Sequence, residues 1–281
     1  MAPTSGDGKY VGVGSAAGRS GGWTGTNERE PSLEYLTAIA KTAEDVGFGT
    51  FLLPVGTGCL DGWVTAAALA PRTERLRYLV AVRPGFTLPA VAARQVTSLD
   101  YLSGGRVSVN VVSGGVPAEQ ARDGDFLDHE ARYRRSFEFV HVLKRLLLED
   151  VVTHEGEFYQ LRDANLQPRA VQRPRPPFFI AGASPQGKKL SVEEAEVYMM
   201  WGETLEQSAQ RFREVKAMAD AAGRTLQYSI SFQVVLGETE EQAWGRASDM
   251  LSKADPSALR RQDSVYQTAD SVGQLRLAKL M

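Results

Sequence analysis

Short apolar runs alternate with longer amphipathic segments along this chain of 281 residues, and this alternation restricts its fold more than any other feature. Such repeats of strand and helix predict a parallel β-sheet with helices packed outside it. We predict six core strands, each followed by a helix, within residues 48–56, 76–85, 103–115, 176–184, 196–203 and 226–238. The sheet is expected either to close into a TIM-type (β/α)8 barrel or to stay open as a doubly wound sheet.

Polar and glycine-rich residues directly follow the predicted strands, and this favours the barrel. The segments are PVGTGC, VRPG, NVVSGG, AGAS and WGE. In (β/α)8 barrels the loops at the carboxyl ends of the strands build the active site. We therefore expect one barrel domain over residues 1–281, with a ligand at that face. Two short runs flank a glycine turn at residues 155–157, which predicts a hairpin inserted at 151–168.

The composition excludes several classes of protein. The net charge is −2, which gives no basic surface for nucleic acid. No apolar run approaches the roughly 18 residues of a membrane helix, and the first residues lack the pattern of a signal peptide. Cys59 is the single cysteine and the three histidines stand far apart, so neither a disulfide nor a zinc site is expected. We expect a cytoplasmic protein with no membrane segment, while carboxylate-based metal binding stays open.

The longest predicted helix spans residues 126–149 and has one apolar face. Its spacing predicts that the apolar side chains pack in the core and that the cationic ones stay in solvent. The apolar set is Tyr133, Phe137, Val140, Leu143 and Leu147, and the cationic set is Arg132, Arg134, Arg135, Lys144 and Arg145.

Two strand ends carry side chains suited to a ligand. Asn110 and Ser113 end an apolar strand, where an amide and a hydroxyl can contact a cofactor. They can equally satisfy the backbone of a turn. Ser184 precedes Pro185 at a predicted helix start and can cap that helix. The backbone N–H groups within residues 181–190 can also bind a phosphate there.

Four segments together resemble one family of enzymes. They are PTSGDGKYVG, VAVRPGFTLPAVAARQVTSLDYLSGGRVSVNVVSGG, GDFLDHEARYRRSFEFVHVLKRLL and DSVGQLRLAKL. The pattern is similar to that of the alkanesulfonate monooxygenases, within the bacterial luciferase-like superfamily of flavin-dependent barrels. This resemblance implies a two-component monooxygenase that binds reduced FMN (FMNH2) and uses O2 to cleave the carbon–sulfur bond of a small organosulfur substrate. It also implies an NAD(P)H-dependent flavin reductase as partner, and a homodimer or homotetramer.

The resemblance also implies which residues form the site. Cys59 and Trp201 are expected to line the catalytic pocket, and Ser5, Ser231 and Gln233 the substrate pocket. The expected cofactor-binding residues are Arg83, Asn110, Ser113, His129, Tyr133, Gly182, Ala183 and Ser184. Structural alternatives remain for several of them. The cysteine and Tyr133 can be core residues, Trp201 can pack under a loop, Arg83 can be an ion-pair partner, and His129 can belong to a helix cap.

Three positions depart from the family pattern and bear on the substrate. Ser5 replaces a loop histidine, while Ser231 and Gln233 replace an arginine and a histidine of the alkanesulfonate enzymes. An anionic sulfonate requires a fixed cation, so these replacements favour a neutral organosulfur substrate.

The two ends of the family barrel also bear on the prediction. Family members have a strand before the PTSGDG loop and continue beyond the position of Met281, so we expect an incomplete barrel that lacks its first and last strands. Two alternative functions remain. One is an oxidoreductase that uses a deazaflavin (coenzyme F420), and the other is a non-catalytic flavin-binding protein.

Overall fold

The computed structural model describes residues 10–12, 31–56, 59–232, 234–252 and 268–278. Its main feature is a sheet of seven parallel strands in the order β1-β2-β3-β4-β7-β8-β9. These strands are β1 (Tyr10–Gly12), β2 (Thr50–Leu53), β3 (Arg77–Val82), β4 (Val107–Val111), β7 (Phe178–Ala181), β8 (Val197–Trp201) and β9 (Gln227–Ser231). The six predicted core strands are thereby confirmed.

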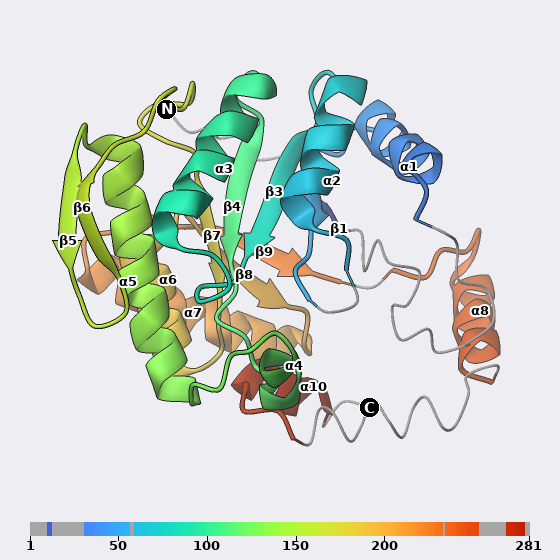
Figure 1. Cartoon of the computed structure of the whole chain (residues 1–281). Coiled ribbons are helices and arrows are strands. Elements are labelled where there is room, and N and C mark those ends of the chain that lie inside the picture. The colour runs from blue at the N-terminus through green and yellow to red at the C-terminus, as the bar shows by residue number, and fades with distance from the viewer. Residues whose placement is uncertain (1–9, 13–30, 57–58, 233, 253–267, 279–281) are drawn as a thin grey trace.

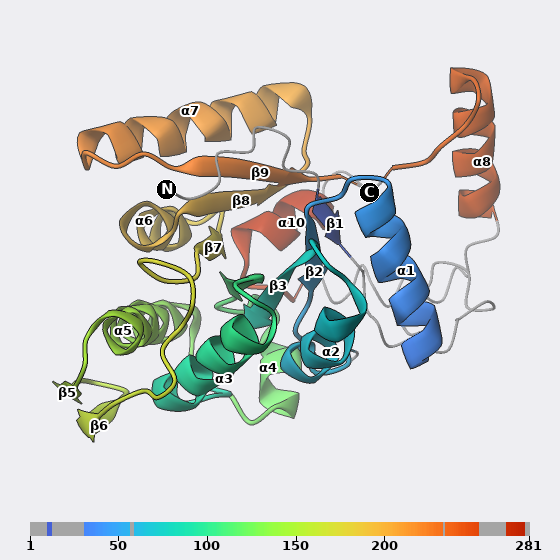
Figure 2. The same cartoon turned by 90° about the horizontal axis from the view of Figure 1, so that it is seen from above.

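The sheet curls without closing, since β1 and β9 are its two edges within the described residues. Figure 2 shows the strands forming an arc, with most of the helices on its convex side. The described part of the chain thus forms an incomplete barrel, as the sequence predicts. The short strand β1 was not predicted, because three residues are too few for a periodic pattern. It pairs with β2 through Tyr10 and Thr50 at its start.

Helices follow most strands of the sheet (Figure 1). Their bounds are α1 (Leu33–Asp45), α2 (Gly62–Leu69), the short 3-10 helix η1 (Ala70–Arg72), α3 (Pro89–Leu102), α4 (Pro117–Arg122), α5 (His129–Leu148), α6 (Pro185–Glu194), α7 (Leu205–Ala221), α8 (Glu240–Ser252) and α10 (Val272–Ala278). An antiparallel hairpin, β5 (Val152–Glu155) and β6 (Gln160–Ala164), lies beside α5 within the range predicted for an insertion.

The two faces of the sheet differ in what covers them. On the convex face Val107, Val109 and Val111 belong to the main core cluster, which also takes in most of the buried apolar residues of α2, α3 and α5. Because side chains alternate along a strand, Asn110 lies on the opposite, concave face. There it is in register with Ala81 and Phe179. Asn110 therefore faces the concave side, one residue before β4 ends at Val111.

Helix α5 corrects one part of the sequence analysis. Tyr133, Val140, Leu143 and Leu147 are buried as predicted, and Phe137 is partly buried against the same core. Arg132 and Arg135, expected in solvent, are 1% and 8% exposed. The Lys144 side chain is also largely buried, in an ion pair with Glu194. Other segments cover this side of the helix, and each buried cation has a carboxylate partner.

Two further observations limit the kinds of site to consider. None of the helices in the described ranges combines the length and apolar composition needed to cross a membrane. The same part of the chain contains no group of three or more His, Cys, Asp and Glu side chains that could hold a metal ion.

Candidate functional site

The predicted site residues lie at the same end of neighbouring parallel strands. Cys59 follows β2, Arg83 follows β3, Asn110 is in β4, Ser184 follows β7, and Trp201 and Ser231 end β8 and β9. The parallel arrangement of the sheet brings these carboxyl ends to one edge. Ser5 and Gln233 lie outside the described residues.

The turn between β7 and α6 is the most compact part of this edge. Ser184 caps α6, since its Oγ accepts a hydrogen bond of 3.1 Å from the N–H of Gly187. Gly182 and Gly187 approach so closely that a Cβ on Gly182 would lie 2.6 Å from the Cα of Gly187. The Tyr198 hydroxyl donates to the Gly182 carbonyl at 2.8 Å. The predicted Ser cap is confirmed, and the turn presents the N-terminus of a ten-residue helix.

Tyr133 reaches this turn from α5. Its hydroxyl hydrogen-bonds Ser184, and a Cβ on Gly187 would lie only 2.8 Å from the Tyr133 Oη. Burial raises the pKa of the Tyr133 hydroxyl, and the hydrogen bond with Ser184 only partly opposes that rise. The hydroxyl therefore stays protonated at neutral pH and can donate a hydrogen bond. Tyr133 is thus a core residue, which was the structural alternative given for it, and its hydroxyl is also a polar group at the turn.

His129 is the first residue of α5 and lies beside Tyr133, with 4.9 Å between the ring centroids. The cap of this helix is Asp128, whose Oδ1 accepts a hydrogen bond of 2.8 Å from the N–H of Ala131. The side chain of His129 therefore packs on Tyr133 without serving as the N-cap.

Asn110 supplies a buried polar atom without a partner. The residue is 8% exposed, and its Oδ1 accepts no hydrogen bond from any described residue. A buried acceptor left unpaired is costly, and it points to a group that binds there. Ser113 lies three residues further on, and its carbonyl accepts a hydrogen bond from Gln120 at 3.4 Å. Gln120 itself has a buried, unpaired Oε1.

Arg83 forms an ion pair, as its structural alternative proposed, and the structure identifies Glu119 as the partner. Its guanidinium contacts Glu119 of α4 at 3.4 Å and also donates to the carbonyl of Val55. Cys59 lies near the same carboxylate. Burial and then the charge of Glu119 raise the pKa of the Cys59 thiol, against an opposing effect of Arg83. The thiol is therefore neutral at pH 7, which fits a pocket wall better than a nucleophile.

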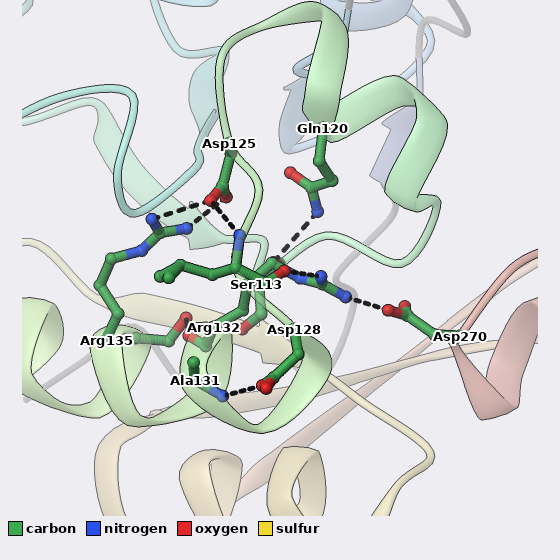
Figure 3. Close-up of polar contacts among 10 residues, drawn as sticks. Ser113, Gln120, Asp125, Asp128, Ala131, Arg132, Arg135 and Asp270 are labelled. Carbon is green, nitrogen blue, oxygen red and sulfur yellow. Dashed lines mark hydrogen bonds and ion pairs between the residues drawn. The ribbon is translucent and has the colours of Figure 1, made fainter.

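A second ion pair ties the segment before α10 to this edge (Figure 3). Arg132 donates to the Asp270 carboxylate at 2.5 Å and to the Leu127 carbonyl at 2.6 Å. The Asp270 N–H donates to the Gly115 carbonyl, beyond β4. The neighbouring Arg135 pairs with Asp125 on the other side of the same loop. The loop after β4 is thus held between two buried arginines of α5.

Helix α10 lies within the curve of the sheet, close to β8 (Figure 2). A Cβ on Gly273 would lie 3.5 Å from the ring of Trp201, and Arg276 contacts Glu203 at 3.7 Å. Trp201 is 46% exposed and pairs in register with Ser231, which is also exposed. Trp201 thus packs under a following segment, as its structural alternative proposed, and still presents ring surface to solvent.

Several residues of this edge had no distinguishing signal in the sequence. Glu119 and Gln120 lie in a polar segment where either could be a solvated surface residue. Asp270 begins the family-like segment DSVGQLRLAKL, but nothing in that segment indicated its partner. Arg132 follows the solvent-side spacing of its helix. Pairing between segments far apart in the chain, such as Arg132 with Asp270, is a tertiary property that periodicity cannot predict.

Comparison with known proteins assigns the family. The model of the luciferase-like monooxygenases matches residues 13–279 of this chain. The chain belongs to this family. The specific assignment to alkanesulfonate monooxygenases does not follow from this match, and it stays a prediction.

Solved structures share the fold at low sequence identity. A riboflavin lyase, solved with modified FMN and riboflavin, aligns with a TM-score of 0.80 at 22% identity, over 92% of this chain and 68% of its own. EDTA monooxygenase from Chelativorans sp. BNC1 gives 0.76 at 23% identity, over 92% and 69%. Long-chain alkane monooxygenase gives 0.75 at 20% identity, over 89% and 69%. This chain therefore spans about two thirds of the length of these relatives.

Proposed function

We propose that this chain is a flavin-dependent monooxygenase that binds reduced FMN and uses O2 to oxidise a small organosulfur substrate with cleavage of its carbon–sulfur bond. Membership of the luciferase-like family supports the monooxygenase class. The proposal of FMN as the cofactor rests on the turn between β7 and α6, together with the unpaired Oδ1 of Asn110.

The described residues fit both ends of FMN. At the turn, Ser184, the Tyr133 hydroxyl and the N-terminus of α6 are the kind of donors that hold a phosphate. The close approach of Gly182 and Gly187 keeps side chains away from that backbone. Asn110 offers an amide oxygen on the concave face, where it can accept a hydrogen bond from the polar edge of a flavin ring. His129, Ser113 and Ala183 are proposed as further cofactor contacts.

Each protein group has a limited role in this proposal. Bound reduced flavin supplies the reaction with O2, which no side chain of the site can perform. The neutral Cys59 thiol and the Trp201 ring form apolar walls that exclude water from the substrate. Arg83 is held in place by Glu119 and Val55. An NAD(P)H-dependent flavin reductase is the proposed source of reduced FMN, and a homodimer or homotetramer the proposed assembly.

Anaerobic titration with reduced FMN tests the cofactor directly. We expect one-to-one binding, and in Tyr133→Phe an affinity lower by about tenfold, the value of one hydrogen bond to a charged group. Riboflavin lacks the phosphate, so its affinity is expected to be equal in the wild type and in this variant. Tyr101→Phe serves as the matched control, because Tyr101 is 60% exposed and lies on α3.

The alternatives predict different results. Preferential binding of a deazaflavin would support hydride transfer without O2. Tight FMN binding with no substrate-dependent uptake of O2, tested with alkanesulfonates and neutral organosulfur compounds, would support a non-catalytic flavin-binding protein. Failure to bind any flavin would contradict the proposal.

A further inference from the structure

Arg83, just after β3, and Glu119, in helix α4, form an ion pair next to Cys59, which is one of the proposed walls of the substrate pocket. Both terminal nitrogens of the guanidinium contact the same Oε1 at 3.4 Å. The Arg83 side chain is 5% exposed, whereas that of Glu119 is 28% exposed. The positive charge is therefore buried behind a carboxylate that still reaches solvent.

The carboxylate is held against the end of β2. A Cβ on Gly56 would lie 2.8 Å from Oε1 of Glu119 and 3.9 Å from the Sγ of Cys59. A glycine at this position thus gives the carboxylate room beside the backbone. The segments that follow three neighbouring strands, β2, β3 and β4, bring a thiol, a guanidinium and the carboxylate of α4 together at one place.

No buried arginine in the described part of the chain is left to attract an anion. The four buried arginines are Arg83, Arg132, Arg135 and Arg211. Each of them is paired with a carboxylate, in the last three cases Asp270, Asp125 and Glu203. A ligand with a sulfonate group would meet Glu119 first, since it is the more exposed member of its pair.

We propose that Glu119 determines the substrate class of this site by neutralising Arg83, so that the site accepts an uncharged organic substrate and rejects organic anions. The inference rests on the proposed function, because it places the substrate at this edge of the sheet. The Glu119 carboxylate repels an anion, and the Arg83–Glu119 pair as a whole has no net positive charge to attract one. Removal of the carboxylate would expose a buried cation suited to bind a sulfonate.

The test compares binding of hexanesulfonate with that of hexyl methyl sulfone, a neutral ligand of similar shape. Both are titrated by calorimetry into the FMN-loaded wild type and into Glu119→Gln. In the variant we expect hexanesulfonate to bind at least about tenfold more tightly, and the sulfone to change by less than about twofold. Combining Glu119→Gln with Arg83→Gln should abolish the gain. Glu157→Gln, which removes a half-exposed carboxylate of the hairpin turn, is the charge-matched control.

Each outcome decides the proposal. It is overturned if the wild type already binds the sulfonate as tightly as the sulfone, if Glu119→Gln gives no gain, or if the gain persists without Arg83. Melting temperatures of all variants identify any that fail to fold. Binding is measured without turnover, so a switch in preference in a protein that oxidises neither ligand would support the role of Glu119 and contradict the monooxygenase function.

Discussion

Strands β4 and β9 are both five-residue parallel strands of one sheet, yet their environments are opposite. All five residues of β4 are buried, whereas none of the five in β9 is. β4 lies between β3 and β7, while β9 has β8 as its single partner among the described strands. The difference extends to their surroundings. Helix α5, near β4, has eleven buried residues, and α8, which follows β9, has none.

This contrast shows which side of the sheet contributes more to stability and to binding. The side around β4 combines the main core cluster with three of the four buried arginine–carboxylate pairs and with the cofactor candidates Asn110 and Tyr133. The side around β9 exposes apolar side chains, among them Phe232, Leu236 and Trp244. Figure 2 shows α8 standing away from the sheet. Changes on the first side should therefore cost folding free energy, and changes on the second should cost little.

The largest contrast is expected between two phenylalanines. Phe139 is fully buried on α5, and Phe139→Ala should lower the free energy of unfolding by about 3–5 kcal/mol, because it leaves a cavity. Phe232 is 59% exposed beyond β9, and Phe232→Ala should change it by less than about 1 kcal/mol. Urea unfolding followed by circular dichroism measures both. Equal losses would remove the distinction between the two sides.

Asp270→Asn should have the next largest effect on stability, and this effect should be confined to the segment around α10. It leaves the buried Arg132 without its carboxylate, and loss of one partner of a buried pair costs about 3–5 kcal/mol. Release of residues 268–278 from the sheet would relieve that cost. We expect faster hydrogen exchange in α10 and a red shift of Trp201 fluorescence, since Gly273 covers that ring. Unchanged exchange in α10 would show that other contacts hold this segment.

Acid should destabilise the side around β4 through Asp125. Burial alone would raise the pKa of Asp125, but the hydrogen bonds from Arg135 and the Leu127 N–H outweigh it and hold the pKa below its ordinary value. Because the pKa is lowered on folding, the stabilisation is complete above the unfolded value of about 3.9 and is lost as the pH falls through the folded value.

Asp125→Asn should therefore flatten the fall in the urea midpoint below about pH 5, while lowering stability at pH 7. Asp220→Asn is the matched control, since Asp220 forms an exposed pair with Lys216 on α7. An identical acid dependence in the wild type and Asp125→Asn would exclude this ion pair as its source.

The smallest effect on stability is expected at α8. Trp244 is 67% exposed, and Trp244→Ser should change the free energy of unfolding by less than about 0.5 kcal/mol. Removal of this apolar surface should instead reduce self-association, which light scattering at several protein concentrations can follow. A loss of stability comparable with that of Phe139→Ala would mean that α8 packs against the rest of the chain.

The sequence predicted the fold from local signals. The six core strands were visible because each is a short apolar run bounded by turn residues, and the parallel sheet followed from their alternation with helices. Ser184 was identified as a cap because Ser followed by Pro is a local signature of a helix start. The short β1 carries no such pattern and was missed.

Only the tertiary structure decided which charges are buried. Arg132 and Arg135 follow the solvent-side spacing of α5, but the loop after β4 and the segment before α10 cover them. The pairing of Arg83 with Glu119 likewise joins the end of β3 to helix α4, and the two residues are 36 positions apart in the chain. Hydrophobic periodicity reports how one helix or strand faces the core, whereas an ion pair requires two segments to meet, and that depends on how the whole sheet curls.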